Sequence, residues 1–188
     1  MTSARRVAFV RHGETDWNRQ RRIQGHTDVP LNDVGREQAR EVGRQLAAGS
    51  WDCVLSSPLA RAVETAELLA HVLDAPPPNR VGGLVERKYG RAEGLPVNEV
   101  NELWPDGESP GSESLVHLGE RGRAVVIEVL NEYEGDLILV SHGALLRATM
   151  SVLTGRSFPR VPNGTATVLE YFPGSRDWQN ALVAVPAT

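Results

Sequence analysis

The 188-residue sequence has little cysteine and no long apolar run. A single cysteine, Cys53, excludes an intramolecular disulfide and fits a reducing compartment. No apolar stretch approaches the roughly 20 residues that a membrane-spanning helix needs. The apolar segment after Arg6 ends at Val10, so it is too short for a secretory signal, whose apolar region has about 7–15 residues. We therefore expect a cytoplasmic protein that has no membrane partner.

Charge and short motifs exclude other classes of protein. The formal net charge of −4 argues against a general nucleic-acid-binding protein. The fingerprints GxxxxGK[ST] and GxGxxG do not occur, which excludes a nucleotide held by either kind of loop. No two histidines stand four residues apart and there is no CxxC pair. We therefore expect no metal ion and no other cofactor.

A cysteine-dependent phosphatase is excluded by spacing. Cys53 and Arg61 follow the pattern C-x7-R, whereas a loop that wraps a phosphate has the tighter pattern C-x5-R. Cys53 also lies within an expected buried strand, so we assign it to packing. Isolated histidines are most often structural or exposed, and this interpretation is adopted for His26, His71 and His117.

Helix and strand patterns alternate along the chain. With 40% hydrophobic and 23% charged residues, the composition is that of a globular protein, and we expect a single domain over residues 1–188. The segment 74–111 is loop-rich, with one strand and one short helix. Elsewhere we predict strands at 5–10, 52–57, 136–141, 166–172 and 180–185, and helices at 33–48, 58–73, 112–133 and 143–153.

Capping residues support two of these helices. Asn32 is the expected N-cap of the helix at 33–48. Ser57 is the expected cap of the helix at 58–73, with Pro58 as its first residue. Strands that alternate with helices predict an α/β fold, a three-layer α/β/α sandwich with a mainly parallel central sheet.

Three expected strands lead into arginine or histidine. The first strand runs into Arg11 and His12, and the strand at 136–141 runs into His142. Arg61 follows the second strand by about one helical turn. Because functional groups gather at the carboxyl ends of the strands in such sheets, we expect these four side chains to meet at one edge.

These residue types suit a phosphoryl group. The planar fork of arginine matches phosphate oxygens, and a neutral imidazole can attack phosphorus to form a covalent intermediate. Nearby cations stabilise the charge on the transferred group and lower the pKa of the histidine. Gly13 and Gly143 each follow a histidine, which permits positive φ or a close backbone approach. The sequence therefore predicts a phosphate pocket.

Four blocks resemble one family. RHGETDWN (11–18), IQGHTDVPLNDVGREQA (23–39), SSPLARAVETA (56–66) and SHGALLR (141–147) are similar, in the same order, to blocks of the histidine phosphatase superfamily, the phosphoglycerate-mutase-like proteins. GSESLVHLGERGRAVV (111–126) resembles a helix often found in phosphatase members. The resemblance covers nearly the whole chain and implies a phosphoglycerate-mutase-like fold.

The resemblance also implies roles for individual residues. His12 would be the phosphorylated nucleophile, and Glu86, in LVERKYG, would protonate the leaving oxygen. Arg11, Arg61 and His142 would hold the phosphoryl oxygens. The implied substrate-binding positions are Arg11, Asn18, Gln24, Gly25, Arg61, His142 and Gly143.

Phosphatase and mutase members differ in how much positive charge surrounds the pocket. ERKYG resembles the mutase version of the acid block, whereas GRAEGLPVNEV resembles the phosphatase version. A mutase must retain a substrate that carries a carboxylate and a second phosphate. The segment 92–120 contains seven acidic residues and neither arginine nor lysine. The cations that remain nearby are Arg87, Lys88 and Arg91.

The stretch between Glu86 and His142 is also too short for the long basic insertion of the family's mutases. We therefore expect a metal-independent phosphomonoesterase of the histidine acid phosphatase type, with little second-site charge and a small or promiscuous phosphomonoester as substrate. A 2,3-bisphosphoglycerate-dependent phosphoglycerate mutase is the alternative. A non-catalytic phospho-ligand-binding protein is the alternative from another class. The sequence leaves the oligomeric state open between a monomer and a homodimer.

Overall fold

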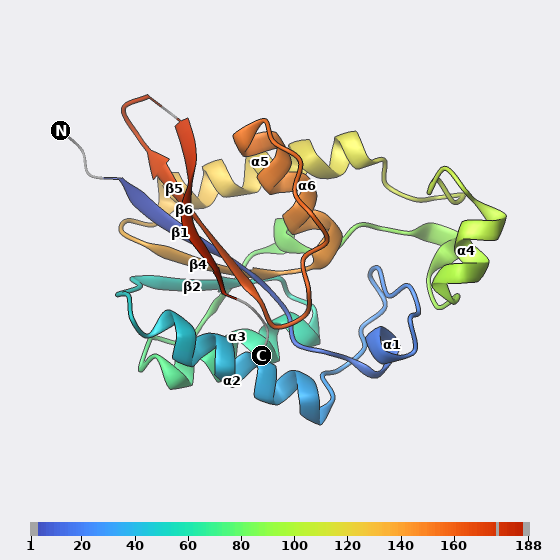
Figure 1. Ribbon diagram of the computed structural model, residues 1–188, viewed down its shortest axis with the longest axis horizontal. Coiled ribbons are helices and arrows are strands. Elements are labelled where there is room, and N and C mark those ends of the chain that lie inside the picture. The colour runs from blue at the N-terminus through green and yellow to red at the C-terminus, as the bar shows by residue number, and fades with distance from the viewer. Residues whose placement is uncertain (1–3, 176, 186–188) are drawn as a thin grey trace.

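A six-stranded sheet forms the centre of the molecule (Figure 1). The computed structural model describes residues 4–175 and 177–185, with residues 180–185 as backbone alone. The described strands are β1 (Arg5–Arg11), β2 (Cys53–Ser56), β3 (Asn79–Arg80), β4 (Leu137–Ser141), β5 (Ala166–Phe172) and β6 (Asp177–Val185). Their order is β3-β2-β4-β1-β5-β6, in which β1 to β4 pair in parallel while β5 and β6 pair antiparallel.

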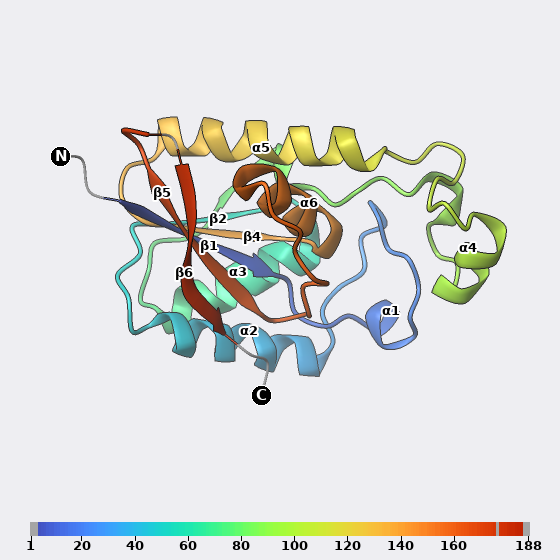
Figure 2. The same ribbon diagram turned by 45° about the horizontal axis from the view of Figure 1, so that its top comes forward.

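Helices cover both faces of this sheet (Figure 2). The described α-helices are α1 (Asp16–Arg19), α2 (Asp33–Leu46), α3 (Ala60–Val72), α4 (Val97–Leu103), α5 (Leu115–Glu132) and α6 (Gly143–Thr154). Helices α2 and α3 pack on one face and α5 and α6 on the other, whereas α1 and α4 stand beyond the end of β1 (Figure 1). The predicted three-layer α/β/α sandwich with a mainly parallel sheet is confirmed.

Alternation along the central strands builds the two halves of the core. Val7 and Phe9 of β1 belong to the cluster with α5 and α6, while Ala8 and Val10 belong to the cluster with α2 and α3. Every residue of β4 is buried. A parallel strand covered on both faces reads as a continuous apolar run, which is why DLILVS was recognisable in the sequence.

Several element boundaries differ from the prediction. Helix α2 has the expected N-cap, since the side chain of Asn32 accepts from the Gly35 N–H, but it ends at Leu46 rather than at residue 48. Helix α5 spans 115–132 instead of 112–133. Strand β6 begins at Asp177, before the predicted residue 180. The four-residue helix α1, which the sequence analysis missed, is too short to show periodicity.

The predicted start of α3 was wrong. The helix begins at Ala60, not at Pro58, and Ser57 is not its cap. The Ala60 N–H donates instead to the carboxylate of Asp28 at 2.8 Å, from a loop 32 residues earlier in the chain. The Ser57 hydroxyl lies 2.8 Å from Nε2 of His142. A contact between distant segments therefore replaced the local cap.

The segment 74–111 contains β3 and α4, as predicted, together with two 3₁₀ turns, η1 (Gly82–Leu84) and η2 (Gly90–Ala92). Glu86 lies between these two turns, outside the sheet. Within the described part of the chain, no helix is both long enough and apolar enough to cross a membrane.

Candidate active site

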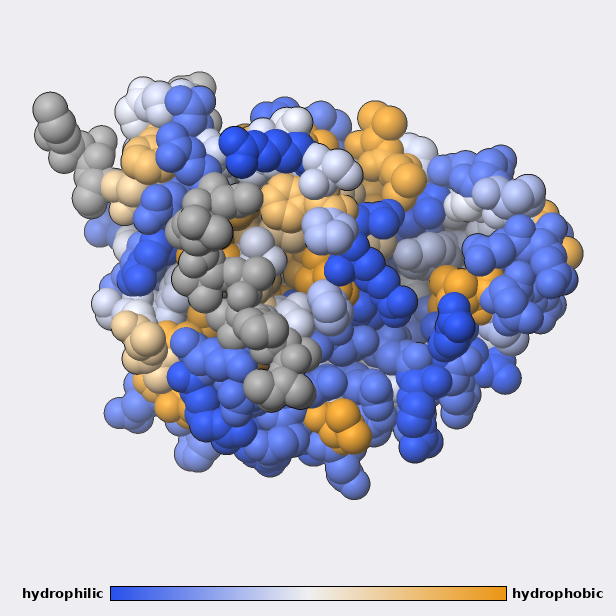
Figure 3. Space-filling model, in the orientation of Figure 1, coloured by the Kyte–Doolittle hydropathy of each residue, from blue (hydrophilic) through white to orange (hydrophobic). Residues whose placement is uncertain are grey.

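The strand ends meet at one edge of the sheet, as the alternating pattern predicted. Arg11 pairs with Ser141 across β1 and β4, and Ser56 pairs with Val140 across β2 and β4. A cavity of about 460 Å³ opens at this edge. Of the predicted site residues, those in its wall are Arg11, His12, Asn18, Gln24, Gly25, Arg61, Glu86 and Gly143. Between α4 and the rest of the molecule the surface is mostly hydrophilic (Figure 3).

His12 is 2% exposed, and the hydrogen bonding of its ring defines the tautomer. Nδ1 lies 2.7 Å from the carbonyl oxygen of Gly13. A carbonyl can only accept, so Nδ1 carries the proton and the neutral ring has its lone pair on Nε2. Burial, followed by the charges of Arg61 and Arg11, lowers the pKa of His12 well below 6.5. The ring is therefore neutral at neutral pH.

The backbone beside His12 is held by a segment that the sequence analysis did not single out. Nδ2 of Asn163 donates to the carbonyl of His12 at 3.1 Å and to that of Gly13 at 3.3 Å. The Gly164 N–H donates to the carbonyls of Arg11 and His12. No sequence signal links these loops, because their contact depends on the pairing of β1 with β5.

Glycine after each histidine serves a close approach rather than positive φ. A Cβ on Gly13 would lie 2.2 Å from the carbonyl oxygen of Gly35, so only glycine allows the loop after β1 to touch the first turn of α2. A Cβ on Gly143 would lie 3.2 Å from the guanidinium of Arg11. Neither glycine has positive φ. Of the two expectations for these positions, the close approach is the one that the structure has.

The two predicted arginines, Arg11 and Arg61, are buried, and only some of their N–H donors have acceptors in the protein. Nη1 of Arg11 donates to the carbonyl of Val161, while the Arg61 guanidinium donates to the carbonyls of Gly25 and Thr27. Nε of both has no hydrogen-bond acceptor among the described residues. Burial lowers the pKa of Arg11 to about 10 and also lowers that of Arg61. Both remain cationic at neutral pH.

His142 lies behind His12 rather than in the cavity wall. It is fully buried, its Nε2 is 2.8 Å from the Ser57 hydroxyl, and its Nδ1 has no partner among the described residues. Burial and the charge of Arg61 lower its pKa well below 6.5. The Ser57 hydroxyl already accepts from the Leu59 N–H, so its own proton can point to Nε2. Nδ1 would then carry the proton of the neutral ring.

Hydrogen bonds around α1 orient two polar side chains of the cavity wall, Asn18 and Gln24. Oδ1 of Asn18 accepts from Thr15 and from Nδ2 of Asn163, so the Asn18 amide nitrogen is left for the cavity. Gln24 accepts from the Thr15 hydroxyl at 3.0 Å. Gly25 has φ +53°, and a Cβ there would overlap the carboxylate of Glu93.

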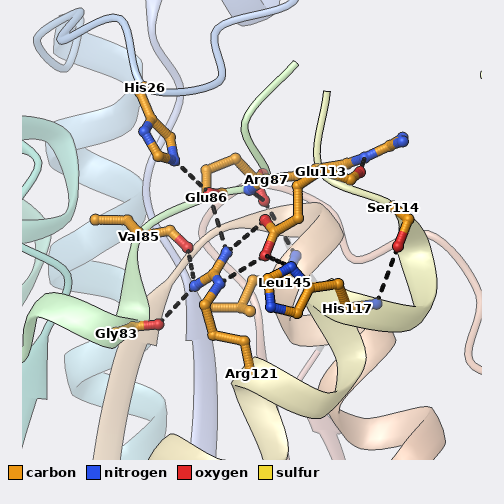
Figure 4. Close-up of polar contacts among 10 residues, drawn as sticks. All are labelled: His26, Gly83, Val85, Glu86, Arg87, Glu113, Ser114, His117, Arg121 and Leu145. Carbon is orange, nitrogen blue, oxygen red and sulfur yellow. Dashed lines mark hydrogen bonds and ion pairs between the residues drawn. The ribbon is translucent and has the colours of Figure 1, made fainter. Parts of the chain in front are cut away.

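Glu86 places its carboxylate at the N-terminus of α6. Oε1 accepts from the N–H groups of Arg87 and Leu145 at 2.8 and 3.0 Å, and Oε2 accepts from the Ala144 N–H at 3.2 Å. Its backbone carbonyl also lies 2.8 Å from Nε2 of His26 (Figure 4). The acid is therefore fixed in direction by backbone donors from two segments.

The cavity carries more positive charge than predicted. The further arginines in its wall are Arg21, Arg22, Arg147 and Arg160. Arg87, which was expected nearby, is turned away and donates to the carbonyls of Glu113 and Gly107. The prediction of little second-site charge was wrong because it considered only the segment 92–120. The additional arginines come from the loop after α1, from α6 and from the loop between α6 and β5.

Other polar groups complete the description. Tyr89 lines the cavity, and burial raises the pKa of its hydroxyl. His71 and His117 are exposed and lie outside the cavity wall. Cys53 is partly buried at the start of β2, where burial raises the pKa of its thiol. No group of three or more histidine, cysteine or acidic residues suited to a metal ion occurs within the described residues.

The fold and this cavity define an α/β protein with a histidine between two buried arginines at the carboxyl edge of its sheet. The sequence matches the model of the histidine phosphatase superfamily (branch 1) over residues 7–182. The chain therefore belongs to the histidine phosphatase superfamily, as its four sequence blocks predicted.

Individual relatives fall on both sides of the phosphatase and mutase division. The uncharacterized phosphatase PhoE of Bacillus subtilis (strain 168) is 41% identical over 150 residues, covering 79% of this chain and 77% of that protein. Phosphoglycerate mutase-like protein 4 of Arabidopsis thaliana is 32% identical over 186 residues, covering 90% and 81%. The solved structure of mycobacterial glucosyl-3-phosphoglycerate phosphatase is 25% identical with a TM-score of 0.87, covering 98% and 100%. These comparisons support an enzyme with phosphatase activity.

Proposed function

We propose that this protein is a metal-independent phosphomonoesterase that acts through a phosphohistidine on Nε2 of His12. The observation that carries the proposal is the hydrogen bond from Nδ1 to the Gly13 carbonyl, which leaves the Nε2 lone pair for the substrate. The lowered pKa of His12 keeps that lone pair unprotonated at neutral pH. Arg11 and Arg61 supply the positive charge that a phosphoryl group needs.

In the first step, the Nε2 lone pair attacks phosphorus and the bond from phosphorus to the ester oxygen breaks. The departing oxygen takes the proton of Glu86, so that an alcohol leaves and Glu86 becomes a carboxylate. Arg11, Arg61 and the Asn18 amide bind the transferred phosphoryl oxygens. His142 does not line the cavity; because its Nε2 is occupied by Ser57, its unpartnered Nδ1 is the atom left to donate towards a phosphoryl oxygen from behind His12.

In the second step, water attacks the phosphohistidine and gives a proton to Glu86. The bond from phosphorus to Nε2 breaks, which restores neutral His12 and releases inorganic phosphate. One residue thus serves as acid and then as base, and the enzyme returns to its starting protonation state.

The rim of the cavity favours a leaving group that carries a second anion. The side chains of Arg21, Arg147 and Arg160 make no hydrogen bond or ion pair with other described residues. Arg160 is close enough to Arg11 to contribute to lowering its pKa. Arg21 has φ +55°, a strained conformation of the kind found at functional sites. Like charges gathered in one cavity are stabilised by a ligand with more than one negative group.

Matched substrates test both parts of the proposal. Phosphate release is measured from p-nitrophenyl phosphate, glycerol 3-phosphate and 3-phosphoglycerate, the last of which adds a carboxylate. We expect hydrolysis of all three and the highest kcat/KM for 3-phosphoglycerate. Equal kcat/KM values for glycerol 3-phosphate and 3-phosphoglycerate would contradict the preference for a second anion but not the phosphatase activity. Failure to hydrolyse any of the three would contradict the phosphatase and favour a phospho-ligand-binding protein.

The rim arginines also favour a second candidate, a 2,3-bisphosphoglycerate-dependent phosphoglycerate mutase. A mutase needs cations that retain a bisphosphorylated intermediate, and the name of the Arabidopsis relative is mutase-like. The two activities separate when 3-phosphoglycerate is supplied with 2,3-bisphosphoglycerate. Release of phosphate identifies the phosphatase, whereas formation of 2-phosphoglycerate without net phosphate release identifies the mutase.

A further inference from the structure

The backbone that carries Glu86 belongs to no strand and no α-helix. Glu86 lies between η1 and η2, two residues after Leu84, the last residue of η1. Figure 4 shows that the Arg121 side chain extends from α5 to this segment. Its guanidinium faces the carbonyl groups of Gly83, Val85 and Glu86. A single side chain therefore contacts the backbone at and just before the proposed acid.

All five N–H groups of Arg121 have acceptors. Nη1 donates to the carbonyls of Gly83 and Val85 at 2.7 and 3.0 Å, and Nη2 donates to the carbonyl of Glu86 at 3.3 Å. Nε and Nη2 donate to the two carboxylate oxygens of Glu113 at 2.8 and 2.9 Å. A guanidinium has five such donors, so none is left for a substrate. Arg121 is also absent from the cavity wall.

Glu113 ties the start of α5 to the same segment. Its side chain is 11% exposed, and both carboxylate oxygens face Arg121. Its backbone N–H donates to the carbonyl of Lys88 at 2.8 Å, and its carbonyl accepts from Nε of Arg87 at 2.6 Å. The residues on both sides of Glu86 are thereby fixed to one end of α5.

We infer that Arg121, held by Glu113, is a positioning residue that sets the placement of Glu86. Helix α6 orients the carboxylate through the N–H groups of Ala144 and Leu145, while Arg121 fixes the backbone through the Glu86 carbonyl. The inference rests on the proposed role of Glu86 as acid and base. Proton transfer needs a heavy-atom separation of about 2.6–3.2 Å, so a small shift of this backbone weakens it.

The test compares Arg121→Ala with Arg123→Ala, a matched control on the same helix. Arg123 is half-exposed and pairs only with Glu120 among the described residues. Rapid-mix kinetics measure phosphorylation of His12 by an alkyl phosphate and by p-nitrophenyl phosphate. For Arg121→Ala we expect a loss of about 10²-fold with the alkyl phosphate, a much smaller loss with p-nitrophenyl phosphate, and little change in KM. Arg123→Ala should match the wild type with both.

Two further variants keep the test decisive. Glu113→Gln preserves side-chain volume but removes the charge that holds Arg121, so it should show the same dependence on the leaving group if Arg121→Ala does not fold. Adding Arg121→Ala to Glu86→Gln should cause no further loss with the alkyl phosphate, because both changes remove one proton transfer. Equal losses for both substrates in Arg121→Ala and Glu113→Gln would overturn the inference. If Glu86→Gln itself shows no dependence on the leaving group, the proposed role of Glu86 fails and the inference falls with it.

Discussion

The imidazole rings of His12 and His142 meet edge to face, with centroids 5.1 Å apart and an interplanar angle of 61°. Only His12 faces the cavity, because His142 is fully buried behind it. Burial and the charges of Arg61 and Arg11 lower the pKa of both rings. A proton on one ring also disfavours a proton on the other. The pair therefore consists of one neutral ring in the cavity wall and one neutral ring behind it.

The first prediction concerns the nucleophile. His12→Ala should abolish hydrolysis of p-nitrophenyl phosphate, because no other imidazole lines the cavity among the described residues. Phosphate release measures the effect, and circular dichroism checks the fold. His71→Ala, at an exposed site on α3, is the matched control and should keep wild-type activity. Turnover by His12→Ala near the wild-type rate would refute the covalent mechanism.

The second prediction concerns the ionisation of His12. Since burial and two arginines lower its pKa below 6.5, the neutral form persists at neutral pH and is lost only as the pH falls through the lowered value. NMR titration of the imidazole should show this directly. Arg61→Ala removes one of the cations and should raise the pKa of His12, whereas Arg40→Ala, at a partly exposed site on α2 outside the cavity wall, should not. A His12 that titrates near 6.5 in the wild type would contradict the neutral nucleophile.

The third prediction separates the acid from the cations. Glu86→Gln keeps the shape but cannot donate a proton, which is worth roughly 10²–10⁴-fold for a poor leaving group. We expect a large loss in His12 phosphorylation by alkyl phosphates, a small loss with p-nitrophenyl phosphate, and a burst of nitrophenol as the second step becomes limiting. Arg61→Ala should lose activity equally with both, since it binds the phosphoryl group common to all substrates. Equal losses for Glu86→Gln would mean that another residue is the acid.

The fourth prediction concerns metal removal. Arginine and histidine side chains provide the charge at this site, so dialysis against EDTA should leave phosphate release unchanged. The measurement is kcat/KM before and after chelation. Loss of activity that a divalent ion restores would refute the metal-independent mechanism.

The fifth prediction concerns the stability supplied by Glu113. Hydrogen bonds from Arg121 lower its pKa below 4.5 in the folded protein, so the folded state binds fewer protons there than the unfolded state. Its contribution is complete above pH 4.5 and is lost as the pH falls through the lowered pKa. Glu113→Gln should cost about 2 kcal/mol in urea unfolding at neutral pH, and less in strong acid. A difference that does not change with pH would contradict this ion pair.

Local sequence determined much of this protein. The apolar run of β4, the Asn32 cap of α2 and the arginine and histidine at the carboxyl end of β1 depend on neighbouring residues or on strand order. Hydrogen bonds between near neighbours and the period of apolar residues are written directly in the chain, so these features could be read without coordinates. The same holds for the family, because each of its four blocks is an unbroken run of residues in the sequence.

The tertiary structure alone decided the surroundings of these residues. It placed His142 behind His12, gave the cap of α3 to Asp28, and brought Arg160 and Arg147 to the cavity rim. It also joined Arg121 to the backbone of Glu86, 35 residues away. Which distant segments touch depends on how helices pack on the two faces of the sheet, and no local pattern encodes that packing.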